Sequence, residues 1–192
     1  MESLKDLNGA ICGEDRQCLD ELESLSQLLR EIDEIARGFE LEAAEGPPPL
    51  ITNLADVERA KHAAAARVPA NFADYLIRRA LYFRYGGGEW NGRCKVCGAP
   101  ASLVVLAREK TGIFEGYRAY ARCVCGSAWP FEAWKCPSCG AAGRENFEVY
   151  ALKEGRLLRC ARCGYLFGEV EEGPDLQAIH VKFALLIAKL RG

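Results

Sequence analysis

The sequence contains few histidines and none of the motifs that mark common nucleotide-binding or hydrolytic enzymes. Only His62 and His180 occur among the 192 residues, and neither has a recognisable partner that would make it a catalytic base. There is no G-x-G-x-x-G, no P-loop and no G-x-S-x-G nucleophile elbow, and Gly86-Gly87-Gly88 fits a helix stop or linker better than a phosphate cradle. We therefore expect a protein that is not an enzyme.

Signals for export and for insertion into a membrane are also missing. The first residues, MESLKDLNGA, have neither a basic start nor an apolar core, and no run of about 18 apolar residues could span a bilayer. We expect a cytoplasmic protein without membrane insertion. In that compartment, closely spaced cysteines are typical of metal ligands rather than disulfides.

Cysteine, in contrast, is abundant and regularly spaced. Eight of the ten cysteines form four close pairs, each followed at once by glycine: Cys94/Cys97, Cys123/Cys125, Cys136/Cys139 and Cys160/Cys163. Three pairs are C-x-x-C, a spacing that lets two thiolates on one tight turn point at a common centre, and glycine tolerates the positive φ at the end of such a turn. Four turns predict two four-cysteine sites that bind two metal ions per chain, Zn or Fe, with no open coordination position for catalysis.

The strands expected between the cysteine pairs indicate which pairs share a metal. Residues 102–106 and 117–122 flank a turn at Thr111-Gly112, and residues 147–152 and 156–159 flank a turn at Glu154-Gly155. Each hairpin joins two cysteine turns. We therefore predict a first site from Cys94, Cys97, Cys123 and Cys125, and a second site from Cys136, Cys139, Cys160 and Cys163. Because Cys123 and Cys125 form a shorter C-x-C pair, the first site is expected to be the more exposed or labile.

The two remaining cysteines, Cys12 and Cys18, stand apart from these pairs. The favoured interpretation is that they are buried, unpaired, small apolar residues. A disulfide between them is the alternative that stays open, as found in cytosolic proteins of hyperthermophiles.

Helical periodicity dominates the first 90 residues. Apolar residues recur at helical spacing from Leu19 to Phe39, and Asn53 and Asn71 can cap two further helices before the glycines at 86–88. Pro174 can open a last helix. The fold class is thus α+β and multidomain, with an all-α helical domain (1–90), two tandem rubredoxin-like or zinc-ribbon modules (91–131 and 132–168) and a C-terminal helix (169–192).

Charge is divided along the chain. Residues 1–46 carry 13 acidic against 4 basic side chains, a net charge of −9, whereas residues 91–165 carry 6 acidic against 12 basic, a net charge of +6. The acidic helical region and the basic cysteine region could attract one another, or each could face a different partner.

The cysteine region resembles the formate dehydrogenase accessory protein FdhE family. The resemblance covers about residues 91–190 and is carried by Cys94 and Cys97 with Gly98, by Cys125-Gly126-Ser127-Ala128-Trp129, by Lys135-Cys136-Pro137-Ser138-Cys139-Gly140, and by Cys160 and Cys163 with Gly164-Tyr165-Leu166. It implies a helical domain, two rubredoxin-like modules and a cytoplasmic factor that contacts the catalytic subunit of formate dehydrogenase and is needed for its activity. In this chain the helical part is shorter than is usual for the family, and the second pair is C-x-C where the family has C-x-x-C.

The leading hypothesis is an accessory or maturation factor, chaperone-like, for the catalytic subunit of a molybdenum- or tungsten-dependent formate dehydrogenase-like enzyme. One alternative is a nucleic-acid-binding zinc-ribbon protein, which Arg156, Arg159 and Arg162 near one cysteine turn support and a pI of about 5.8 disfavours. Another is a rubredoxin-like electron carrier. The metal, the client and the oligomeric state stay open, a homodimer included.

Overall fold

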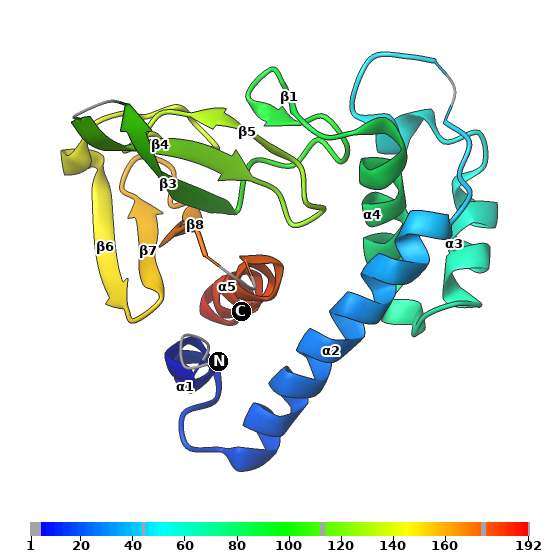
Figure 1. Cartoon of the computed structure of the whole chain (residues 1–192), viewed down its shortest axis with the longest axis horizontal. Coiled ribbons are helices and arrows are strands. Elements are labelled where there is room, and N and C mark those ends of the chain that lie inside the picture. Colours follow the sequence, from blue (N-terminus) through cyan, green and yellow to red (C-terminus); the bar gives the residue numbers. More distant parts are fainter. Residues whose placement is uncertain (1–4, 44, 112–113, 174–175, 192) are drawn as a thin grey trace.

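The computed structural model describes residues 5–43, 45–111, 114–173 and 176–191. Helices come first, strands follow, and a last helix ends the chain (Figure 1). The α-helices are α1 (Lys5–Cys12), α2 (Arg16–Gly38), α3 (Val57–Ala65), α4 (Ala73–Tyr85) and α5 (Leu176–Arg191), and the short 3-10 helices are η2 (Leu50–Asn53), η3 (Ala70–Phe72) and η4 (Arg144–Asn146). The strands are β1 (Glu89–Trp90), β2 (Arg93–Cys94), β3 (Leu103–Thr111), β4 (Phe114–Arg122), β5 (Ala128–Phe131), β6 (Phe147–Leu152), β7 (Gly155–Cys160) and β8 (Leu166–Glu171).

Helix and sheet are both present, as the sequence predicts, while the bounds of the four domains stay a prediction. Among the helices of the described ranges, none has the length and apolar character needed to cross a membrane. Pro174 and Gly112, which the sequence places at a helix start and a turn, lie outside the described residues.

Two predicted helix caps are wrong. The side chain of Asp56, not Asn53, accepts a hydrogen bond from the Arg59 N–H and caps α3. Asn53 lies in η2, and Asn71 lies in η3 before α4. In both places a proline precedes the segment and the chain first forms a 3-10 turn, so that α3 begins only at Val57 and α4 only at Ala73.

A disulfide joins α1 to the start of α2. Cys12 and Cys18 are bonded, with their Cα atoms 5.6 Å apart, so the expectation of two unpaired buried thiols is wrong. Gly13 has a φ of 63°, and its N–H donates to the Gly9 carbonyl, which ends α1 and turns the chain back. The turn brings two cysteines together that sequence spacing alone left undecided.

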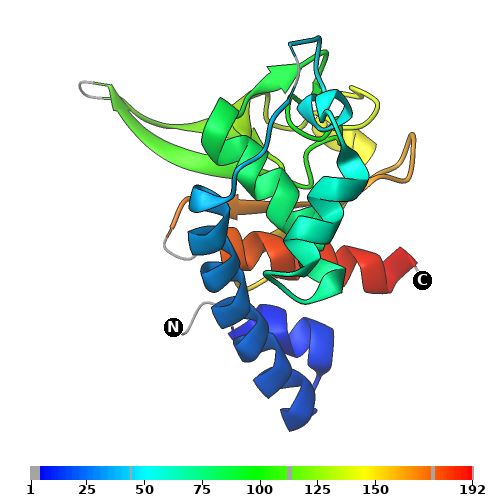
Figure 2. The ribbon, with the colours of Figure 1, turned by 90° about the vertical axis from the view of Figure 1, so that its right-hand side faces the viewer.

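The two predicted hairpins belong to a single six-stranded sheet, whose order is β5-β4-β3-β8-β7-β6. Each hairpin has a third strand that the sequence did not predict. Strand β5 follows the second cysteine turn and pairs with β4, and β8 follows the fourth cysteine turn and pairs with β7. The two three-stranded units meet where β3 and β8 run parallel, in the register Leu103↔Gly168 to Leu106↔Glu171. The hairpin of β3 and β4 extends beyond the rest of the sheet (Figure 2).

Helix α5 covers one face of this sheet. Ile179, Phe183 and Ile187 pack against Leu103, Val105, Leu157 and Val170 in one apolar cluster. A Cβ on Gly168 would lie 2.6 Å from Cδ1 of Phe183, so only glycine lets the helix approach this closely. The last helix therefore depends on a glycine in the strand that joins the two units.

The two histidines have structural positions. His62 is exposed on α3. His180 is fully buried on α5, with its Nε2 2.6 Å from the Ser102 hydroxyl. Burial lowers the pKa of His180 to about 3, so the imidazole is neutral in the folded protein.

Candidate metal centres

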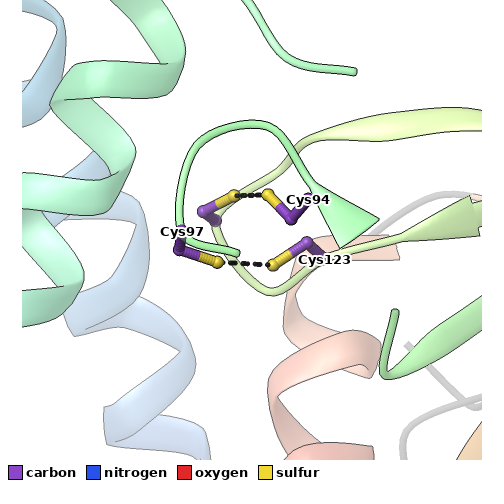
Figure 3. A group of neighbouring side chains, drawn as sticks. Cys94, Cys97 and Cys123 are labelled. Atoms are coloured by element: carbon purple, nitrogen blue, oxygen red, sulfur yellow. Dashed lines mark hydrogen bonds between the residues drawn. The ribbon is translucent and has the colours of Figure 1, made fainter. Parts of the chain in front are cut away.

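The structure brings the eight paired cysteines into two clusters, grouped as the hairpins predict. The sulfur atoms of each cluster all lie within 4.8 Å of one another: Cys94, Cys97, Cys123 and Cys125 in the first, and Cys136, Cys139, Cys160 and Cys163 in the second. In the first cluster, the thiols of Cys97 and Cys123 point at each other with sulfurs 3.3 Å apart (Figure 3). We call these groups cluster one and cluster two.

The sulfur separations fit a tetrahedral ion. A Zn–S bond of about 2.3 Å places two sulfurs of a tetrahedron about 3.8 Å apart. In cluster one the closest sulfurs are 3.3 Å apart between Cys97 and Cys123 and 3.5 Å apart between Cys94 and Cys125. In cluster two they are 3.6 Å between Cys136 and Cys163 and 3.8 Å between Cys139 and Cys160. Each cluster could therefore hold one metal ion with little movement of the turns.

The C-x-C turn is a shortened version of the C-x-x-C turn. In each C-x-x-C turn the first cysteine donates its N–H to the carbonyl of the residue after the glycine, as Cys136 does to Ala141 at 2.8 Å. Cys123 makes the same bond to Ser127 at 2.9 Å, because Ser127 also follows the glycine. The glycines of all four turns have a positive φ, between 73° and 98°, which explains why glycine follows every pair.

Cluster one lies deeper in the protein than cluster two, so the prediction that it is the more exposed is wrong. Its cysteines are buried except for the half-buried Cys97, whereas Cys139 and Cys163 of cluster two are exposed. The reason is tertiary rather than local. Three cysteines of cluster one belong to the same apolar core as the packed faces of α2, α3 and α4.

An arginine of α4 and an aspartate of α2 fasten the C-x-C turn to the helices. Arg79 donates from Nη1 to the Cys125 carbonyl at 2.7 Å, and from Nε and Nη2 to both carboxylate oxygens of Asp33, each at 2.5 Å. Arg79 is 5% exposed and its guanidinium lies 4.7 Å from the ring centre of Phe83. Gly126 makes room for this arrangement, because a Cβ there would collide with Nη1.

A glutamine of α5 makes a second connection at the same turn. Gln177 donates from Nε2 to the Val124 carbonyl at 2.8 Å and to the Tyr75 hydroxyl at 2.9 Å. Its carbonyl oxygen accepts from Arg122 at 3.0 Å. Burial raises the pKa of Tyr75 to about 12, so the phenol stays protonated. Side chains of α4 and α5 thus hold the backbone of one cysteine turn.

Aromatic side chains pack beside cluster two. Phe147 lies between Trp134 and Phe167, and Tyr165 stacks on Phe167. Cys136 and Cys160 share an apolar cluster with these rings. The rings therefore surround these sulfur ligands with apolar bulk.

The backbone also favours thiolates at the exposed side of cluster two. A hydrogen bond from the Ala141 N–H lowers the pKa of Cys139 to about 7, whereas burial raises the pKa of Cys136 to about 12. One exposed sulfur is therefore partly ionised at neutral pH and available to an arriving cation.

None of the sequence motifs pointed to Arg79, Asp33 or Gln177. A signal was nonetheless present for Arg79, because helical spacing from Leu76 to Phe83 places it on the apolar face of α4. A charged residue on such a face needs a buried partner. The partners lie far away in the sequence and could not be named from it.

These features define an α+β protein with two closed four-cysteine clusters. Among solved structures, this chain is similar to the crystal structure of the FdhE protein from Pseudomonas aeruginosa, with 17% identity, a TM-score of 0.45, and coverage of 90% of this chain and 68% of that chain. No family model and no curated protein matches the chain.

Proposed function

We propose that this protein is a non-enzymatic accessory factor that binds the catalytic subunit of a molybdenum- or tungsten-dependent formate dehydrogenase-like enzyme and supports its assembly. The observation that carries the proposal is the pair of four-cysteine clusters, which offer four sulfurs each and leave no ligand position for substrate. The cysteine turns and the residues that follow them are those that resemble the FdhE family, and the client is inferred from that resemblance.

We further propose that each cluster holds one Zn²⁺ or iron ion through its four cysteines. A bound ion would cross-link two turns and add folding free energy to units with small apolar cores. Cys160→Ser should therefore lose one of two metal equivalents and destabilise the second unit of the sheet. The matched control is Cys12→Ser with Cys18→Ser, which removes two cysteines outside the clusters and should keep both ions. Two equivalents of metal in Cys160→Ser would contradict the assignment.

Ion pairs among the basic residues favour a protein partner over nucleic acid. Five basic residues of the cysteine region are paired with glutamates, which neutralises much of its positive charge: Arg108, Arg118, Lys135, Arg156 and Arg159. Arg156 contacts Glu169, whose side chain is 3% exposed, so it has a structural role rather than a free phosphate-binding one. Phosphate backbones are bound by exposed arginines and lysines whose charge is not already compensated.

The functional test combines genetics with binding. A strain that lacks the gene should contain the catalytic subunit in normal amount but with low activity, and the full-length chain should restore it. Purified protein should bind the purified subunit and show no steeply salt-dependent affinity for DNA or RNA. Normal enzyme activity in the deletion strain, together with salt-sensitive nucleic-acid binding, would instead support the zinc-ribbon alternative.

A further inference from the structure

The two three-stranded units of the sheet are repeats of one arrangement. The first consists of β3, β4 and β5, and the second of β6, β7 and β8. Arg122, just before Cys123, pairs with Ala128, and Arg159, just before Cys160, pairs with Leu166. Ala128 therefore corresponds to Leu166. Strand β3 occupies the same position in the first unit as β6 in the second, and β5 the same position as β8.

The junction between the units shows what the edge of β3 opposite β4 can bind. Strand β8 lies along β3 in parallel orientation. The Gly168 N–H donates to the Ser102 carbonyl and the Glu172 N–H donates to the Leu106 carbonyl, both at 3.0 Å. Hence an extended segment with N–H groups at alternate positions pairs with this edge.

The corresponding edge of β6 lies at the end of the sheet. Within the described part of the chain no strand pairs with it, and it lies on the side away from α2, α3 and α4 (Figure 1). Leu103 pairs with Arg122 in the first unit and Glu148 pairs with Arg159 in the second, so Leu103 corresponds to Glu148. Counting along the strands, Val104 corresponds to Val149 and Leu106 to Ala151. The backbone groups of Val149 and Ala151 therefore face outward. Val149 is 41% exposed and Tyr150 48% exposed, so residues of this strand are accessible from solvent.

A second copy of this chain is a poor occupant of the edge. By the repeat, the strand of another copy that would pair with β6 is its β5, the counterpart of β8. Pro130 corresponds to Gly168, the residue whose N–H donates across the junction. Proline has no N–H, so β5 cannot make that bond, and head-to-tail association of copies is weakened.

An apolar cavity of about 510 Å³ lies beside this edge on the face covered by α5. Tyr150, Leu152 and Leu157 from the sheet and Leu186 and Leu190 from the helix line it, and Leu190 is 57% exposed. Because side chains alternate along a strand, every second side chain of a segment paired with β6 would point toward this cavity. The edge and the cavity together specify an extended, partly apolar peptide.

We propose that the outer edge of β6 binds an extended, proline-free segment of the client polypeptide in parallel orientation, as β3 binds β8. The partner's identity as the formate dehydrogenase-like catalytic subunit rests on the proposed function. The chemistry of the segment rests on the structure of the edge itself. The segment needs N–H donors at alternate positions for the carbonyls of β6, and apolar side chains that face Tyr150 and the end of α5.

The test removes one outward N–H without touching the pairing to β7. Val149→Pro lacks that donor and is tolerated because proline is accepted where an edge strand's N–H faces solvent, while Val149→Ala shortens the side chain and keeps the donor. The probe is a synthetic peptide copying residues 166–172, and its control carries Gly168→Pro. The peptide should bind the wild type and Val149→Ala comparably, and Val149→Pro on the order of tenfold more weakly. The proline peptide should lose binding to a similar extent.

Hydrogen exchange gives a readout that does not depend on the variant's folding. The Val149 and Ala151 amides of the wild-type chain should become protected when the peptide or the purified client subunit is added. Equal client binding by wild type and Val149→Pro, with no protection on β6, would overturn this inference and leave the proposed function intact. Protection by the peptide combined with no client binding would support the edge and refute the proposed client. No protection by either partner would overturn the inference.

Discussion

The contact of Arg79 with Asp33 and Cys125 offers the sharpest test of how the helices support cluster one. Arg79→Met keeps the length and the apolar stem of the side chain but removes three hydrogen bonds. Breaking a buried ion pair costs about 3–5 kcal/mol, but Asp33 retains 21% exposure and is partly rehydrated, which reduces that cost. The Cys125 carbonyl loses its donor as well, at about 1 kcal/mol or more.

We therefore expect Arg79→Met to lower the free energy of unfolding by about 3 kcal/mol, which corresponds to a decrease in Tm of about 6–12 °C for a chain of this size. Arg84→Met is a matched control on the exposed side of the same helix and should change Tm little. The measurement is thermal unfolding of the metal-loaded protein, followed by timed release of metal to a chelator. Release from cluster one should accelerate, with release from cluster two unchanged.

A double-mutant cycle distinguishes the ion pair from simple packing. Asp33→Leu removes the carboxylate that Arg79 neutralises, so the double variant with Arg79→Met should lose less stability than the two single variants added together. Strict additivity, or a Tm for Arg79→Met equal to that of the wild type, would refute the claim that this pair holds the C-x-C turn.

Three further results are expected. Wild-type protein should lose metal to a chelator from cluster two first, because Cys139 and Cys163 are exposed; earlier loss from cluster one would contradict the role of burial. The contribution of neutral His180 to the free energy of unfolding should be fully present above pH about 6.5, the ordinary pKa of histidine, and should fall as the pH is lowered toward the depressed pKa of His180 of about 3, by up to about 1.4 kcal/mol per pH unit. Denaturant titrations at several pH values should show this loss for the wild type and not for His180→Gln. The same dependence of unfolding free energy on pH in both proteins would contradict it. Gly168→Ala should cost about 1–3 kcal/mol by pushing Phe183 away from the sheet, and a calorimetric Tm equal to that of the wild type would show that α5 can shift freely.

The sequence was most informative where chemistry is local. The spacing of the cysteines and the glycine after each pair predicted four turns, and the two hairpins predicted which turns meet. Both inferences concern residues close in the chain, where backbone geometry and strand pairing limit the possibilities. The same holds for α2, whose apolar stripe from Leu19 onward is evident in the sequence.

Prediction failed where distant residues decide the outcome. The length of the C-x-C pair suggested an exposed cluster, but burial is determined by α4 and by Arg79, which pack there for reasons outside the motif. Strand β8 was missed because Gly168 and two glutamates interrupt its apolar character, although its pairing with β3 and the approach of Phe183 require that glycine. The helix caps failed for a local reason: the caps lie at Asp56 and Phe72 rather than at Asn53 and Asn71, because nearby prolines changed the start of each helix.

The parallel joint between β3 and β8 also constrains the order in which the protein can form during synthesis. Strand β3 leaves the ribosome long before β8, which follows both cysteine turns of the second unit. The first unit can thus close its turns early, yet its inner edge remains open until the second unit is complete, and α5 can cover that seam only afterwards. A nascent chain stalled before residue 166 would therefore expose the edges of β3 and β7 that later pair with β8, in addition to the two outer edges of the finished sheet, which makes the interval before the last strand emerges the period of greatest risk for misassembly.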